Sequence, residues 1–240
     1  GNHTQIELLA LPELHPPTVT HQGDTIQPDD FNPRCDAIPI ANLLATNYNW
    51  LNQAVDATPY RIANILREWA SHYHDGLRVL RRVDNQNPVG FYALYPTQRE
   101  SEIRFFSPPS QGLHLSQVST VDPFKMAIPG DRECRSVFVR SFVIDPVYRD
   151  RYQAAFVQDA QVVLANMQQE FPNLMDMYTL IIHPSYAKLA QMLGFQATGT
   201  DPKLPLQWMY QAVDRFLALD VKQALAQPLM NSQTPANQHQ

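Results

Sequence analysis

The segment from Ser136 to Gly194 constrains the fold of this chain more than any other part. Its apolar residues recur first with the period of a strand, then with that of a long helix, then again as a strand and a short helix. A strand that runs through a tight turn into a helix points several backbone N–H groups at one place, and the helix dipole adds positive charge there. Such a unit is suited to bind a phosphate-bearing ligand. We expect its elements at residues 136–144, 145–151, 151–171, 177–182 and 186–193.

Composition limits the class of protein. With 240 residues, of which 44% are hydrophobic, the chain can hold one large domain or two small ones. A charged content of 17% and a net charge of −5 argue against a nucleic-acid-binding protein, which usually carries a basic field. No apolar run approaches the about 18 residues that a membrane span needs. The first residues lack the basic start and apolar core of a signal peptide, so we expect a cytoplasmic protein.

The rest of the chain divides into an extension, a domain and a tail. Residues 1–35 are polar and interrupted by proline, and we expect an N-terminal extension there. Residues 36–227 form the predicted domain, and the Gln-, Asn- and Pro-rich residues 228–240 form a tail that we expect to be disordered. Within the domain we expect helices at 42–55, 59–73 and 214–226, and strands at 77–83, 88–95 and 204–213.

A long irregular connection is predicted at residues 98–132, which contain four prolines and two glycines. An irregular connection of this length in a compact domain is often a lid or a binding loop. An ordinary surface excursion explains the pattern equally well. The sequence therefore leaves both interpretations of this loop insertion open.

Two motifs in the central segment resemble those of a known superfamily. Residues 142–154 read Phe-Val-Ile-Asp-Pro-Val-Tyr-Arg-Asp-Arg-Tyr-Gln-Ala, and residues 185–195 end in Leu-Gly-Phe. The first stretch resembles the acyl-CoA motif of the GNAT superfamily of N-acyltransferases, and the second is similar to its Tyr-x-x-Leu-Gly-Phe motif. The hairpin that contains Pro88-Val-Gly-Phe-Tyr-Ala is similar to strands two and three of that fold. Together the matches cover roughly residues 40–215 in the right order.

The resemblance implies a fold. It is an α/β (α+β) fold with a mixed, mostly antiparallel central sheet, helices on its faces, and a splay between the two central parallel strands. It also implies an N-acyltransferase that moves an acyl group from acetyl-CoA or another acyl-CoA to a small-molecule amine by direct attack. Two cysteines, Cys35 and Cys134, are too few for a disulfide framework or a cysteine metal site, and we expect no metal.

The resemblance also assigns residues to the donor. The main chain of the central strand would bind the pantetheine arm, through Phe142, Val143 and Ile144. The backbone that follows would hold the pyrophosphate, through Arg149, Asp150, Arg151, Tyr152, Gln153 and Ala154.

The chain departs from the superfamily at two positions. Tyr152 stands where the family has a glycine that lets the backbone approach the pyrophosphate, and Ala190 stands where it has a general-acid tyrosine. Tyr186, one helical turn earlier, could replace that acid, or it could simply pack on the sheet. His183 could deprotonate the amine, or it could be a turn residue. Glu133 could act as a base through water, or it could be a solvated charge.

Alternatives to an acyl-CoA enzyme remain open. The segment that begins at His183-Pro-Ser-Tyr is also similar to N-acyl amino acid synthases and autoinducer synthases. That resemblance implies acyl carrier protein as the donor and partner. Tyr152 and Ala190 also allow a second interpretation. In it the chain is a GNAT-like module that has lost catalysis and binds a ligand or a protein. An apolar C-terminal strand and helix could mediate a homodimer.

Overall fold

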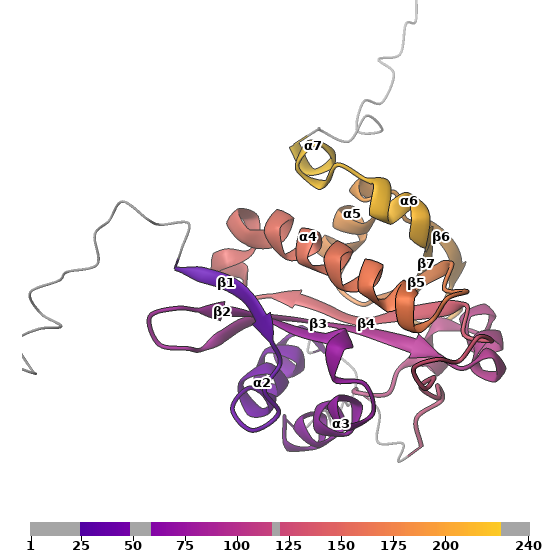
Figure 1. The fold of residues 1–240 in the computed structure, drawn as a ribbon, viewed down its shortest axis with the longest axis horizontal. Helices are drawn as coiled ribbons and strands as arrows, with labels where there is room; N and C mark the ends of the chain where they lie inside the picture. Colours follow the sequence, from indigo (N-terminus) through magenta and orange to yellow (C-terminus); the bar gives the residue numbers. More distant parts are fainter. Residues whose placement is uncertain (1–24, 49–58, 117–120, 227–240) are drawn as a thin grey trace, which may run out of the picture.

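The structure, a computed structural model, describes residues 25–48, 59–116 and 121–226. One seven-stranded sheet with the order β1-β2-β3-β4-β5-β7-β6 runs through it (Figure 1). Neighbouring strands are antiparallel, except that β4 and β5 are parallel. The strands are β1 (Ile26–Asp30), β2 (Leu77–Arg82), β3 (Pro88–Thr97), β4 (Ser136–Ile144), β5 (Asp176–Ile181), β6 (Gln196–Thr200) and β7 (Gln207–Ala212). The predicted fold class, a mostly antiparallel mixed sheet with parallel central strands, is confirmed.

Helices cover both faces of the sheet (Figure 1). One face carries α2 (Ala37–Tyr48) and α3 (Pro59–His72). The other carries α4 (Pro146–Glu170), α5 (Pro184–Met192), α6 (Val213–Ala218) and α7 (Val221–Ala226). Short 3-10 helices are η3 (His74–Gly76), η4 (Arg99–Phe106) and η5 (Pro109–Gly112).

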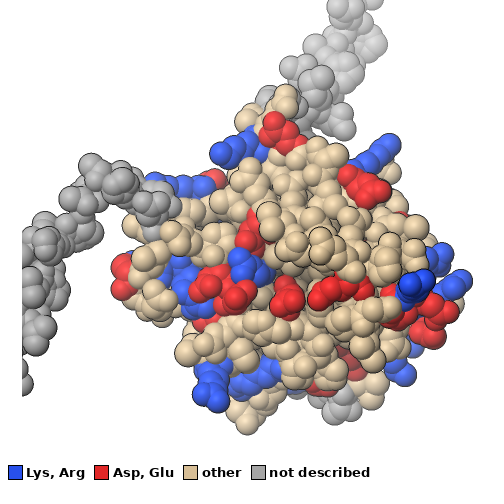
Figure 2. Space-filling view, viewed as in Figure 1, with Lys and Arg blue, Asp and Glu red and all other residues tan. Residues whose placement is uncertain are grey.

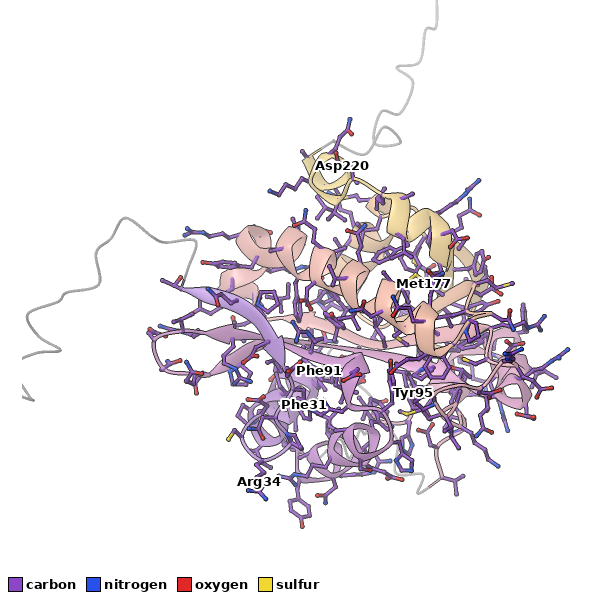
Figure 3. All side chains as sticks on the ribbon, viewed as in Figure 1. Phe31, Arg34, Phe91, Tyr95, Met177 and Asp220 are labelled. Atoms are coloured by element: carbon purple, nitrogen blue, oxygen red, sulfur yellow. The ribbon has the colours of Figure 1, made fainter. Side chains whose placement is uncertain are left out.

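Two apolar cores lie between these layers. Alternate side chains of a strand point to opposite faces, so each strand contributes to both cores. On the side of α2 and α3, Phe31 and Phe91 are fully buried (Figure 3). On the side of α4, Met177 of β5 packs with the apolar face of that helix (Figure 3). The central strands therefore lie between two apolar layers, and any gap between them opens onto both.

The predicted N-terminal extension contains a strand, β1, that the sequence did not reveal. Ile26 is buried, but the following residues are polar and edge-exposed, so they carry no apolar alternation. Ion pairs hold β1 in place: Arg81 of β2 binds Asp29 at 2.8 Å and the buried carboxylate of Asp36 at 2.7 Å. These pairs join residues about 50 positions apart, which local patterns cannot encode. Residues 1–24 of the predicted extension and the tail 228–240 lie outside the described residues.

Helix caps moved two predicted boundaries, and the C-terminal elements also differ from the prediction. The long helix begins at Pro146, not near Arg151, because the Asp145 carboxylate accepts a hydrogen bond from the Val147 N–H at 3.0 Å and proline suits the first helical position. The short helix α5 begins at Pro184 and not at residue 186, because the His183 side chain caps it by accepting a hydrogen bond from the Ser185 N–H. The predicted terminal helix is two short helices, α6 and α7, and β6 was not predicted.

Charges on the visible face are mixed. Figure 2 shows basic and acidic side chains side by side among a larger uncharged surface. Within the described residues, no helix is both long and apolar enough to cross a membrane.

Candidate functional site

The two central parallel strands separate half-way along their length. β4 pairs with β5 only from Ser136 to Val139, opposite Asp176 to Thr179. The Thr179 hydroxyl closes the pairing with a 3.1 Å hydrogen bond to the Val139 carbonyl. Beyond this point the strands enclose a cavity of about 100 Å³, lined by β4, β5, α2, α4 and α5. The splay that the resemblance implied is present in the structure.

A bulge in β4 marks the start of the gap. Ala93 of β3 pairs with Ser141 and Leu94 pairs with Val139, so Arg140 is an extra residue. Both Arg140 and Ser141 therefore belong to the α2–α3 side. The Arg140 side chain is 2% exposed and donates to Asp122 at 2.7 Å.

Aromatic rings surround the Arg140 guanidinium. Its central carbon lies 4.6 to 5.4 Å from the ring centres of Trp69, Tyr95, Phe138 and Phe124. A buried cation with one carboxylate and several ring faces is held rigidly. Because Asp122 comes from the predicted 98–132 connection, this contact ties that segment to the start of the gap.

The main chain of β4 faces the cavity. Ile144 N–H donates to the Tyr186 hydroxyl at 3.1 Å across the gap. Alternate residues of a strand direct their N–H and C=O groups to the same side, so the N–H of Phe142 also points into the gap. Phe142 lines the cavity. The Phe142 N–H thus faces the cavity, whereas the Ile144 N–H is hydrogen-bonded to Tyr186.

Tyr186 is held in place from the other side by Arg149. The guanidinium lies 4.0 Å from the tyrosine ring centre and donates to Ser185 Oγ at 2.6 Å and to its carbonyl at 2.8 Å. Burial raises the pKa of the Tyr186 phenol, so it keeps its proton at neutral pH. A protonated phenol at the wall of the gap can donate a proton to a leaving group.

The His183 side chain caps the N-terminus of α5. Its Nδ1 accepts from the Ser185 N–H at 3.2 Å and lies 2.7 Å from Ser185 Oγ. Since Nδ1 accepts, the neutral ring carries its proton on Nε2. In this tautomer His183, which lines the cavity, offers an N–H group rather than a basic nitrogen.

The backbone assigned to the pyrophosphate is helical in this structure. Because α4 begins at Pro146, the N–H groups of Asp150, Arg151, Tyr152, Gln153 and Ala154 lie beyond its first turn, where N–H groups bond to carbonyls four residues earlier. In the first turn, Pro146 has no N–H, and Asp145 accepts from Val147 and Tyr148. An acidic cap also disfavours an anion at this helix end.

Tyr152 does not fill the gap. Its side chain is 7% exposed, packs in the α4-side core, and places its hydroxyl 3.2 Å from Thr25 Oγ1. The gap itself is lined by Ala190, where the superfamily has its acid, and by Tyr186. The structure therefore brings Tyr186, His183, Phe142 and Ala190 together.

Glu133 lies apart from this group. It is exposed and precedes the N-terminal end of β4, while the gap opens at the other end. From Ser136 to Arg140 the strand rises about 3.3 Å per residue, or about 13 Å in all, and Glu133 lies three residues before the strand begins. Within residues 25–48, 59–116 and 121–226, no cluster of three metal-binding side chains occurs.

Two lining residues come from a helix that the sequence did not connect with the site. Asn47 and Tyr48 end α2 and lie at the cavity. Burial raises the pKa of the Tyr48 phenol, which stays neutral. Residue 48 lies within the helix predicted at 42–55, and nothing local to it points to β4, which lies some ninety residues away.

A second, larger cavity of about 380 Å³ lies beside α3 and the 98–132 connection. His114 lines it, and burial lowers the pKa of this histidine to about 4. Among the described residues, its Nδ1 and the Ser116 hydroxyl are buried without a hydrogen-bond partner. Part of the predicted 98–132 connection thus forms a buried wall of this second cavity.

The fold has counterparts among solved structures. PH1933 from Pyrococcus horikoshii OT3 superposes with a TM-score of 0.50 at 11% identity, over 78% of this chain and 98% of that chain. Together with the strand order and the splay after Val139, this decides the architecture. The fold is the GNAT fold.

Other solved proteins with this fold show a weaker likeness. An acetyltransferase of the GNAT family from Staphylococcus aureus MU50 has a TM-score of 0.48 at 15% identity, over 78% of this chain and 99% of that chain. Spermidine N-acetyltransferase from Vibrio cholerae, in complex with CoA and spermine, has 0.46 at 17%, over 80% and 98%. No protein-family model and no curated protein matches the sequence. The GNAT fold of this chain is therefore recognised from its tertiary structure.

Proposed function

We propose that this chain is an N-acyltransferase that moves an acyl group from a pantetheine thioester to a small-molecule amine. The observation that carries the proposal is the gap between β4 and β5 after Val139 and Thr179, which opens a cavity against the main chain of Phe142. An extended amide chain can pair with an unpaired strand edge, and pantetheine has such amides. The cavity wall also holds a protonated phenol, Tyr186.

The reaction is a direct transfer. The neutral amine nitrogen attacks the thioester carbonyl carbon, the C–N bond forms and the C–S bond breaks. The Phe142 N–H stabilises the developing oxyanion. The amine loses its proton to water, because Glu133 is remote and His183 Nδ1 is occupied. The thiolate takes a proton from the Tyr186 phenol, which water then restores.

The donor can be CoA or a carrier protein, since both present an acyl pantetheine thioester. Binding requires Ile144 N–H and Arg149 to exchange their contacts with Tyr186 and Ser185 for contacts with the donor. The phosphate would then be held by the side chains of Arg149 and Arg151 instead of by backbone N–H groups. A carrier protein presents only one phosphate, so it requires fewer anion-binding groups at this helix end than CoA does.

A second candidate function is a non-catalytic GNAT-like module. The capped N-terminus of α4 favours it, because the backbone from Asp150 to Ala154 has no N–H group to offer to a pyrophosphate. The contact between Tyr186 and Ile144 also occupies part of the donor edge. In this case the cavity would bind a ligand without turnover.

The test is thiol release in the presence of a panel of primary amines, with acyl-CoA in one arm and acyl-loaded carrier protein in the other. Melting temperature is followed in parallel, since a ligand of the folded state raises it with concentration. Arg149→Ala is expected to weaken the CoA arm more than the carrier-protein arm. Binding without thiol release in either arm would favour the module, and neither binding nor release at millimolar thioester would refute the acyltransferase. Formation of a homodimer stays a prediction, which sedimentation of the same sample would check.

A further inference from the structure

The cavity between β4 and β5 has two chemically different ends. Its α2 side is polar and carries the side chains of Asn47, Tyr48 and His183. Its other end lies between the sheet and α4, α5 and α6, and is apolar. The residues at that end include Val157, Ala160, Met177, Ile181, Leu189 and Phe216.

Strand alternation explains why the ends differ. On β5, Met177 and Ile181 belong to the core on the α4 side, while Leu180 packs with the core on the α2 side. Figure 3 shows Met177 on the side of α4. Because the gap lies between the strands, it connects the two layers, and a bound molecule can extend from one into the other. The polar end suits the amine and the apolar end suits the acyl group.

The apolar end excludes charged and strongly polar groups. Among the described lining residues, Arg140 and His183 belong to the other end. The hydroxyl of Tyr92, which lines the cavity from the α4-side core, is already hydrogen-bonded to Asp159 at 2.6 Å. A polar group placed between Met177, Leu189 and Phe216 would lose its hydration without gaining a hydrogen bond. A hydrocarbon chain loses nothing there and gains contact with buried carbon atoms.

The volume of the cavity limits the length of the acyl chain that it can hold. An engineered cavity of about 150 Å³ lined by apolar residues binds benzene, which has six carbon atoms. In proportion, the whole cavity of about 100 Å³ holds about four carbon atoms, so its apolar end holds no more than that. The rings of Phe195 and Phe216, 6.2 Å apart, line its far end.

We propose that the apolar end binds the acyl chain of the donor, and that the donor carries a short straight chain of at most about four carbons rather than a long fatty chain. This rests on the proposed acyltransferase function for the reaction, but the chain-binding cavity itself does not depend on turnover. The amine then enters from the side of Tyr48. Small residues, Ala160 and Ala190, leave the room that the chain occupies.

The experiment is a series of acyl-CoA donors from acetyl to palmitoyl, measured by thiol release and by thermal shift. Affinity is expected to rise about fourfold per methylene up to butyryl and then to stop rising. Ala190→Leu fills the cavity and should cost at least about tenfold in affinity for butyryl-CoA, moving the optimum toward acetyl. Ala70→Leu is the matched control: both alanines are 7% exposed, but Ala70 lies in α3 away from the cavity, and its length profile should not change.

A second arm does not need thioester chemistry. 1-Butanol should raise the melting temperature of the unchanged protein and of Ala70→Leu, and should have no effect on Ala190→Leu. Thiol release that is highest with acetyl-CoA and insensitive to Ala190→Leu would overturn the chain-length proposal while the transferase stands. A shift with 1-butanol but no thiol release with any donor would refute the proposed reaction and leave the chain-binding cavity supported. No shift with 1-butanol and no chain-length preference would overturn the inference.

Discussion

Replacing Tyr186 by phenylalanine should move donor affinity and turnover in opposite directions. The change removes one oxygen atom and keeps the ring on which Arg149 stacks at 4.0 Å. The lost contact is the 3.1 Å hydrogen bond from the Ile144 N–H. In the proposed reaction this hydroxyl has two tasks: it occupies a donor-binding N–H group and it protonates the leaving thiolate.

The magnitudes follow from these tasks. A hydrogen bond contributes about 0.5–1.5 kcal/mol net, so a donor that no longer displaces the hydroxyl should bind about fivefold more tightly. Loss of a general acid should lower kcat by roughly 10²–10⁴-fold. The Ile144 N–H borders the cavity, where water can replace the hydroxyl, so stability should fall by only about 1 kcal/mol, or roughly 2–4 °C in Tm.

The assay combines calorimetry with butyryl-CoA, single-turnover thiol release and thermal unfolding. Tyr210→Phe is the control, because it removes a 2.7 Å hydrogen bond to Asp176 outside the cavity and should change stability alone. A Tyr186→Phe protein with unchanged kcat would show that water protonates the thiolate. Weaker donor binding would show that the hydroxyl holds the donor and does not compete with it.

Three further predictions concern stability. Asp36→Ala leaves the buried Arg81 guanidinium without its bidentate partner and should cost about 3–5 kcal/mol in urea unfolding, whereas a loss under 1 kcal/mol would contradict the assigned burial. Gly194→Ala should destabilise by about 1 kcal/mol or more, since φ is +90° and the new methyl would lie 2.6 Å from Gln211 Nε2; an unchanged Tm would argue against it. His114 has a folded-state pKa of about 4, below that of an unfolded histidine, so the unfolded state binds more protons and stability should fall as the pH drops from about 6.5 toward 4. His114→Gln should flatten that part of the pH profile, and an unaltered profile would exclude this histidine as its source.

Local patterns were sufficient for much of the fold. The strand at 136–144 has the predicted bounds because it is rich in β-branched and aromatic residues, although Arg140 and Ser141 interrupt it, and α4 ends where a proline follows. Gly194 ends α5 with a positive φ, as a C-terminal glycine should. The predicted start of α4 was wrong, because residues 145–151 were interpreted as an anion-binding turn although Asp145 and Pro146 carry the local signal of a helix start.

The candidate site, too, was predicted where local patterns were sufficient and was missed where distant residues meet. Tyr186 was a candidate from its position on a helix face, and the structure places it at the gap. The burial of Tyr152 against Thr25 and the enclosure of Arg140 by four rings were beyond sequence reasoning. Both depend on residues that are far apart in the chain.

By itself, the sequence determined the order of most strands and helices, since the period of apolar residues and the identity of turn residues are local properties. The exceptions are β1 and β6, whose mostly exposed residues carry no apolar alternation. Only the tertiary structure decided where β4 and β5 separate, which side chains meet in the gap, and that one end of the cavity is apolar. Asn47, Phe142 and Phe216 lie at one cavity although their chain positions span 170 residues. Such contacts depend on how whole layers pack, and packing is set by the sum of all side chains in a layer and not by any one segment.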